Sequence, residues 1–224
     1  RIGYLFLATR EREMQVLQEN LKLQHRFGIP VELLDPGEIA RRYPYLKLDD
    51  VLGGTFCSWD GYAGPSEVLA GFANGARRAG VKIYEGVEAT EIFVEGGRVS
   101  GVKGKGETIA TPVVINAGGP YAALVGRMAG ADIPVKPLRR QIFITAPFKL
   151  SDRNIPLTID FSRGWYFRPE VDGFLLSGPL DREPSFNVNI DYGARLEAAE
   201  NAMFRVPAFE KASIARGCGG LYEI

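Results

Sequence analysis

The feature that most constrains the fold is the junction VVINAGGPYAALVG at residues 113–126, where a strand-like run enters a helix-like run through two glycines. Residues 113–115 are all β-branched, so they predict a strand buried on both faces. Pro120 suits the first turn of the helix that follows. Gly118 and Gly119 leave backbone N–H groups open to a close neighbour because they carry no side chain. The junction therefore predicts either a tight turn packed against another element or backbone lying against a phosphate-bearing cofactor.

The composition argues against several classes of partner. Lysine plus arginine and aspartate plus glutamate both number 27, so the formal net charge is zero and nucleic-acid binding is not expected. No apolar run approaches the roughly 20 residues of a membrane-spanning helix, so membrane insertion is not expected. Cys57 and Cys218 lack metal-ligand spacing, and a single histidine excludes a multi-histidine site, so no metal is predicted. The absence of a disulfide framework predicts a reducing compartment, the cytoplasm.

The hydrophobic periodicity predicts a mixed α/β chain. Helices are expected at residues 10–27, 36–42, 66–79 and 191–204. Ser66 is the expected N-cap of the third helix, and the buried stripe of that helix should be Leu69, Phe72, Ala73 and Ala76. Besides residues 113–115, strands are expected at 2–8, at the start of VELLDPGEIARRYP (residues 31–44) and in VLGGTFCSWDG (residues 51–61). Further strands are expected at 81–85, 87–94, 98–104, 107–110, 134–146, 156–161, 164–169, 173–178 and 213–222. Gly96–Gly97 and the Gly104–Gly106 stretch predict two hairpin turns.

Six segments in order resemble a known family. The longest starts GPSEVLAGFANG at residue 64 and ends with the twin-glycine junction; GYLFLATRE and GIPVELLDPGEIARRYP precede it, and VKPLRRQIFIT, GWYFRPEVDGFLLSG and GCGGLYEI follow. In these segments the chain is similar to the D-amino-acid-oxidase-like FAD-dependent oxidoreductases. The last two segments most resemble the branch of the sarcosine oxidase β subunit and dimethylglycine dehydrogenase. The resemblance implies FAD and oxidation of the C–N bond of an amino acid or N-methylated amine, such as sarcosine, dimethylglycine or proline, by hydride transfer to flavin N5.

The resemblance also predicts a divided fold. It implies an α+β (α/β) chain in which part of an FAD-binding domain is intermixed with an antiparallel-sheet substrate domain. Residues 1–58 would begin the substrate domain, 59–132 would form the middle of the FAD-binding domain, 133–212 the antiparallel sheet, and 213–224 the return to the FAD-binding domain. The chain lacks the G-x-G-x-x-G turn with which family members begin. We therefore expect residues 1–224 to be a fragment that binds FAD weakly or not at all by itself.

The resemblance assigns cofactor contacts to four residues of the chain. Ala117, Gly118 and Gly119 would let the backbone approach FAD. Ala89, in the segment GVEATEI, would meet the adenine through its backbone N–H and C=O groups.

Three further residues are candidates for the catalytic site. Tyr166 would sit over the substrate side of the flavin and contact the substrate carboxylate, and Arg168 points to the same face of the strand. An edge strand with ordinary amphipathic alternation is the alternative for both. Tyr222 would lie at the substrate mouth; glycine oxidase has a carboxylate-binding arginine there, which argues against glycine as the substrate.

The neighbouring Arg139 and Arg140 could supply positive potential to a carboxylate or form a solvated pair.

The sequence leaves two functions open. The first is an enzyme that acts on a small amino-acid or amine substrate and that could have a partner subunit or an electron-acceptor protein. The alternative is a non-catalytic flavoprotein-like scaffold or assembly factor of the same fold.

Overall fold

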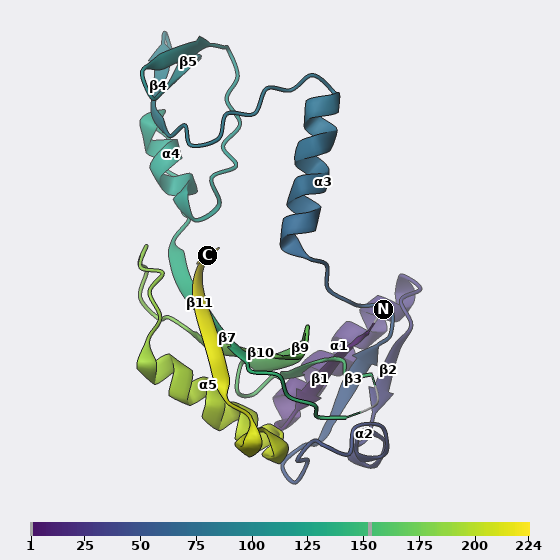
Figure 1. The fold of residues 1–224 in the computed structure, drawn as a ribbon. Helices are drawn as coiled ribbons and strands as arrows, with labels where there is room; N and C mark the ends of the chain where they lie inside the picture. The colour runs from purple at the N-terminus through teal and green to yellow at the C-terminus, as the bar shows by residue number, and fades with distance from the viewer. Residues whose placement is uncertain (1, 152–153) are drawn as a thin grey trace. The chain divides into compact units, whose positions relative to one another are not determined.

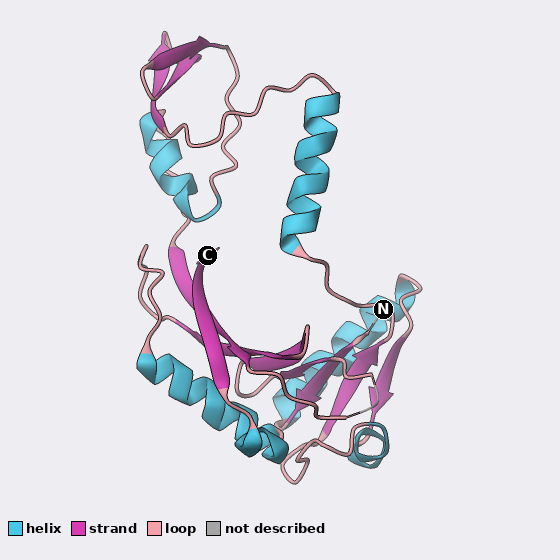
Figure 2. Cartoon of the chain, viewed as in Figure 1, coloured by secondary structure: helices cyan, strands magenta, loops and turns pink. Residues whose placement is uncertain are grey.

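The computed structural model describes residues 2–151 and 154–224 and forms two compact units (Figure 1). Unit 1 comprises Arg1–Tyr62, Arg140–Asp181 and Asn187–Gly220; unit 2 comprises Ala63–Arg139, Arg182–Phe186 and Leu221–Ile224. Helices and strands occur in both units (Figure 2), so the predicted mixed α/β fold class is confirmed.

Unit 1 is built on an eight-stranded sheet with the strand order β11-β7-β10-β9-β8-β1-β3-β2. The strands are β1 (Tyr4–Ala8), β2 (Val31–Leu34), β3 (Gly53–Cys57), β7 (Pro137–Thr145), β8 (Leu157–Asp160), β9 (Trp165–Glu170), β10 (Gly173–Leu180) and β11 (Ile214–Glu223). The helices are α1 (Glu11–Arg26), α2 (Pro36–Arg42), α5 (Tyr192–Arg205) and the 3-10 helix η2 (Pro207–Lys211). β1 and β8 pair in parallel, while β7, β10, β9 and β8 pair antiparallel in turn, as predicted for the strand-rich part of the chain.

The core of unit 1 includes residues of β1, β2 and α2, and a large part of it lies between the sheet and α5. The helix turns three small buried residues inward, so its backbone can approach β9 and β10 closely: Ala194, Ala198 and Ala202. The Phe209 ring packs edge to face on Phe167 and Phe174, with centroid distances of 5.5 and 5.2 Å. Burying each such ring contributes about 1.5–3 kcal/mol, so these contacts hold η2, which follows α5, against the sheet.

The opposite side of β7, β9, β10 and β11 is called the open face below. The alternation along β7 separates the two sides: Arg139, Gln141, Phe143 and Thr145 are buried, whereas Arg140, Ile142 and Ile144 are only half-buried. On β9, Trp165 and Phe167 belong to the core, so Tyr166 and Arg168 project from the open face.

A buried ion cluster ties the end of α5 to β8. The Arg205 guanidinium donates to the Asp160 carboxylate from Nε at 2.9 Å and from Nη2 at 2.8 Å. Its Nη1 donates to Asp50 at 2.8 Å and to the Lys47 carbonyl at 2.6 Å. The side chains of Arg205 and Asp160 are fully buried, and the next cation near Asp160, Arg163, lies 3.8 Å away, so Arg205 is the closest cation to this buried carboxylate.

Unit 2 contains a three-stranded antiparallel sheet, β4-β5-β6. Its elements are α3 (Pro65–Arg78), β4 (Ala89–Glu95), β5 (Arg98–Gly104), β6 (Glu107–Ala110), the 3-10 helix η1 (Gly119–Tyr121) and α4 (Ala122–Met128), which packs against β4. Both predicted hairpin turns are confirmed. Gly96 and Gly97 have φ of +57° and +76°, and Lys105 and Gly106 have +44° and +88°, as two-residue hairpin loops with positive φ at both positions require.

The prediction for α3 was right about the helix and wrong about its burial. Gly64 is the N-cap and Pro65 follows it, so Ser66 lies inside the first turn. No residue of α3 is buried by the described parts of the chain, and Leu69 and Phe72 are 70% and 77% exposed. The amphipathic spacing shapes the helix locally, but burial of its apolar stripe needs a partner element, which the described residues do not supply.

Two predicted strands are absent from the described structure. Residues 113–115 belong to neither sheet, and Val113 and Ile115 are 67% and 86% exposed, so the expected double burial is wrong. Residues 81–85 likewise form no strand. A strand needs a neighbour to complete its hydrogen-bond ladder, and neither segment has one within residues 2–151 and 154–224. Among the described residues, no helix is both long enough and apolar enough to cross a membrane.

Candidate functional site

The twin-glycine junction in unit 2 is a turn held by a single side chain. Asn116 accepts a hydrogen bond from the Gly118 N–H at 3.1 Å and donates one to the Ala122 carbonyl at 2.9 Å. The Tyr121 N–H then donates to the Gly118 carbonyl at 2.9 Å. Asn116 thus fixes the path of the backbone through both glycines and into η1.

The two glycines are required for different reasons. A Cβ on Gly118 would lie 3.1 Å from Asn116 Oδ1 and 3.3 Å from the Ala122 nitrogen, so Gly118 is needed for close packing inside the turn. Gly119 has φ +50°, and no atom lies within 4 Å of the place where its Cβ would be. Ala117, beside them, is exposed. A turn with bare, accessible backbone at Gly119 fits the predicted approach of a cofactor.

A second feature of unit 2 surrounds Ala89. A cavity of about 170 Å³ is lined by Tyr84, Val87, Ala89, Val102, Gly104, Glu107 and Ile109. A Cβ on Gly104 would come within 2.9 Å of the Glu88 carbonyl and of Val87, so only glycine fits there. Tyr84 and Ile109 are half exposed, which leaves the cavity accessible from outside. Its mostly apolar lining and the Tyr84 ring suit a planar ring.

The open face of unit 1 holds Tyr166. The Tyr166 N–H donates to Ser177 Oγ on β10 at 2.8 Å, which fixes its backbone. The Arg140 guanidinium lies 5.5 Å from the centre of the Tyr166 ring and donates from Nη2 to the Gly164 carbonyl at 2.9 Å. Arg140 is therefore half-buried, and its guanidinium contacts the Gly164 carbonyl and the Tyr166 ring. Arg139 is only 6% exposed, so the alternative that the two arginines form a solvated pair is wrong.

Arg168 lies on the same face as Tyr166, but it already has partners. It forms a close ion pair with Glu170, and its Nη1 donates to the Pro169 carbonyl at 3.0 Å. Its guanidinium lies 4.2 Å from the centre of the Tyr62 ring, and the Tyr62 hydroxyl donates to the same Pro169 carbonyl at 3.0 Å. Glu170 balances the charge of Arg168, so this arginine presents little free positive charge to a ligand.

A cavity of about 260 Å³ opens beside Arg168 on this face. Leu175 pairs with Arg168 on one side and with Ile144 on the other, so the three residues form one row across β9, β10 and β7. They line the cavity together with Glu170, Arg216, Gly217 and Cys218. Sequence reasoning missed Arg216. Alternation in IARGCGG places it opposite Gly217, but only the sheet order brings it to this row.

Tyr222 lies near the end of β11 and is 48% exposed. The end of β11 is fixed to the start of β7 by two hydrogen bonds between Lys136 and Ile224, of 2.7 and 3.0 Å. Tyr222 belongs to unit 2, whereas Tyr166 and Arg168 belong to unit 1. The structure thus brings Tyr166 and Arg168 together on one face and Gly118 and Gly119 together in one turn.

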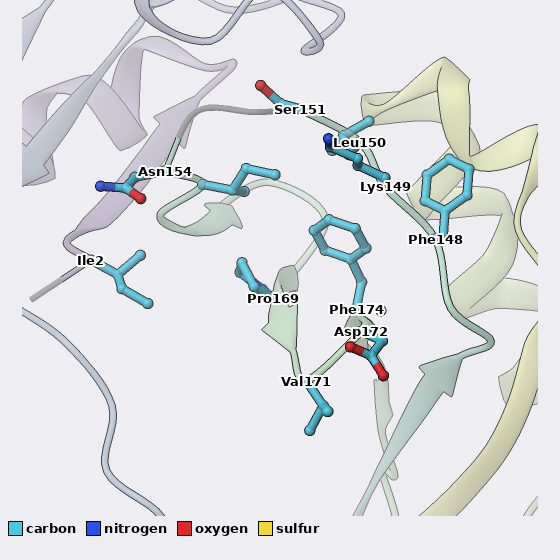
Figure 3. A pocket seen from close by; sticks show the side chains of 12 residues that line it. Ile2, Phe148, Lys149, Leu150, Ser151, Asn154, Pro169, Val171, Asp172 and Phe174 are labelled. Carbon is cyan, nitrogen blue, oxygen red and sulfur yellow. The ribbon is translucent and has the colours of Figure 1, made fainter.

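Unit 1 has another cavity, of about 350 Å³, next to the β9–β10 hairpin (Figure 3). Phe148 and Phe174 line it together with Pro169, and Ile2 lies on the opposite side (Figure 3). Val171 at the hairpin tip is 91% exposed and has φ +49°, which is unusual for a β-branched residue. None of the predicted site residues lines this cavity.

The family follows from a comparison with known proteins. Residues 1–223 match the sequence profile of the DAO family, described as FAD dependent oxidoreductase. The chain belongs to this family. The predicted resemblance is confirmed, and the family points to FAD as the cofactor.

Individual relatives agree with the family match. Human mitochondrial sarcosine dehydrogenase is 27% identical over 95% of this chain and 25% of its own length. Glycine oxidase from Geobacillus kaustophilus is 27% identical over 98% of this chain and 57% of its own length. The crystal structure of L-proline dehydrogenase from P. horikoshii superposes with a TM-score of 0.89 and 30% identity, covering 98% of this chain and 60% of that chain. The chain therefore spans between a quarter and about 60% of the length of these relatives.

Proposed function

We propose that the protein containing this chain is an FAD-dependent oxidoreductase that oxidises the C–N bond of an amino acid or N-methylated amine, such as sarcosine, dimethylglycine or proline. The match of residues 1–223 to the DAO family carries this proposal. The similarity to a sarcosine dehydrogenase and to an L-proline dehydrogenase supports the choice of substrate class.

On this proposal, flavin is held in part by the backbone of unit 2. The open space at Gly119 and the exposed Ala117 support contact of the twin-glycine turn with FAD, with Gly118 packed behind them. The apolar cavity beside Ala89 supports binding of the adenine ring at β4. When bound, the flavin supplies an acceptor, at N5, for a hydride from the substrate carbon next to nitrogen. The chain's own residues must then bind and orient that substrate.

We assign the substrate side to the open face of unit 1. The Tyr166 hydroxyl would donate to the substrate carboxylate, since a phenol donates strongly to an anion. Arg140 and Ser177 support this role because they fix the ring and the backbone of Tyr166. Arg168 would lie beside Tyr166 with its positive charge neutralised by Glu170. Tyr222 would line the opening through which the substrate enters.

The proposed domains separate flavin-binding residues from substrate-binding residues. We propose that residues 59–132 and 213–224 serve the flavin and that residues 1–58 and 133–212 serve the substrate. The location of Ala89, Gly118 and Gly119 in unit 2 and of Tyr166 and Arg168 in unit 1 supports this division.

The test uses the full-length protein that contains this chain. Its visible absorption should show bound flavin, and anaerobic addition of sarcosine, dimethylglycine or L-proline should bleach that band, whereas glycine should not. A Tyr166→Phe variant should keep its flavin and lose roughly ten- to a hundredfold in kcat/KM, because one hydrogen bond to a charged group is removed. A bound flavin that no amine reduces would instead support the scaffold function, and a protein purified without flavin would contradict both.

A further inference from the structure

Arg216 on β11 is the one charged side chain in the lining of the 260 Å³ cavity that has no oppositely charged partner among the described residues. It is exposed and forms no hydrogen bond or ion pair with any residue that the structure describes. The other charged groups of the cavity, Arg168 and Glu170, form an ion pair with each other. The cavity lining therefore carries one net positive charge, and Arg216 is its source.

The floor of the cavity is apolar. Leu175 on β10 pairs with Ile144 on β7, and both strands lie between β9, which carries Arg168, and β11. Gly217 does not fill the cavity, because its missing Cβ faces the Phe143 ring, 2.7 Å away on the core side. Arg216, next to it in the strand, therefore projects to the open face. A short aliphatic group with one anionic end is complementary to such a lining.

We propose that Arg216, rather than Arg168, binds a carboxylate of the substrate. This inference rests on the proposed function, which makes the substrate an amino acid. Tyr166 and Arg168 are two residues apart on β9 and share the open face, so the cavity with Arg216 lies in the row next to Tyr166. Arg216 presents free guanidinium donors, which can bind a carboxylate with two parallel hydrogen bonds. Arg168 presents fewer free donors because Glu170 and the Pro169 carbonyl occupy its guanidinium.

The test compares three variants of the flavin-loaded, full-length protein: Arg216→Gln, Arg216→Lys and Arg26→Gln. Arg26 is an exposed arginine in the last turn of α1 and gives the same charge change away from the cavity. Calorimetry measures binding of cyclopentanecarboxylate, which has no oxidisable amine, and of its uncharged carboxamide. Steady-state kinetics with the amine that reduces the flavin gives KM and kcat for each variant.

We expect Arg216→Gln to weaken carboxylate binding roughly ten- to a hundredfold and to raise KM similarly, while carboxamide binding stays unchanged. Arg216→Lys should recover part of the loss, and Arg26→Gln should resemble the wild type. The inference is overturned if Arg216→Gln binds the carboxylate like the wild type, or loses the carboxylate and the carboxamide equally. If no amine reduces the flavin but Arg216→Gln still loses carboxylate binding selectively, the proposed reaction fails while the anion site stands.

Discussion

The Arg205 guanidinium donates two hydrogen bonds to one oxygen of Asp160, and neither side chain is accessible to solvent. This pair joins the C-terminal end of α5 to the end of β8. The same strand β8 pairs with β9, which carries Tyr166. The buried pair therefore supports the sheet that presents the open face.

Removing the arginine alone should be costly. In Arg205→Met, the buried Asp160 carboxylate loses both hydrogen bonds from Arg205 and keeps only the Arg163 guanidinium, 3.8 Å away, so the free energy of unfolding should fall by about 3–5 kcal/mol. Urea unfolding followed by circular dichroism measures this change. Asp49→Asn is the matched control, because Asp49 is 84% exposed and pairs with Lys47 only at 3.9 Å, and it should change stability by less than about 0.5 kcal/mol. A loss for Arg205→Met as small as that of the control would contradict the structural role of the pair.

Asp50 makes part of this stability depend on pH. Burial alone would raise the pKa of Asp50, but the hydrogen bonds from Arg205 outweigh it and hold the pKa below its ordinary value of 3.8. A lowered pKa in the folded state adds stability that is fully present above about pH 4 and is lost as the pH falls through the folded-state pKa. Unfolding free energies measured from pH 7 to pH 3 should therefore decline less steeply below pH 4 in Asp50→Asn than in the wild type. Identical slopes would show that Asp50 does not titrate through this contact.

The sequence predicts the elements whose signals are local. The helices α1 and α5 and the two hairpins of unit 2 lie within a residue or two of their predicted positions, because apolar spacing and turn glycines act within a few residues. The expected burial of residues 113–115 and of the α3 stripe is wrong because burial depends on a partner element, which no local pattern encodes.

The site follows the same division between local and long-range information. Strand alternation correctly predicts that Tyr166 and Arg168 share a face. It could not reveal that Tyr62 contacts Arg168, since that contact depends on how distant segments of the chain pack. Arg216 enters the same row only through the order of β9, β10, β7 and β11 in the sheet.

The twin-glycine turn offers a test of the cofactor contact. Gly119 and Gly130 both have positive φ, +50° and +74°, and neither has an atom within 4 Å of its missing Cβ. Each Gly→Ala change should therefore cost a similar amount, about 1 kcal/mol of backbone strain. Only Gly119→Ala should also weaken flavin binding in the full-length protein, by about tenfold, because its methyl group enters the space assigned to the cofactor. Flavin content after dialysis and calorimetric titration with FAD compare the two variants; equal flavin affinity would contradict the contact.

The reaction proposed for the protein removes a hydride from the carbon next to the substrate nitrogen. The most direct measurement is the rate of anaerobic flavin bleaching in the full-length protein, with the reducing amine and with the same amine deuterated at that carbon. We expect that one of sarcosine, dimethylglycine and L-proline bleaches the flavin and that deuteration slows the bleaching. A flavin that stays oxidised with all three amines, or that bleaches equally fast with the deuterated amine when chemistry limits the rate, would contradict it.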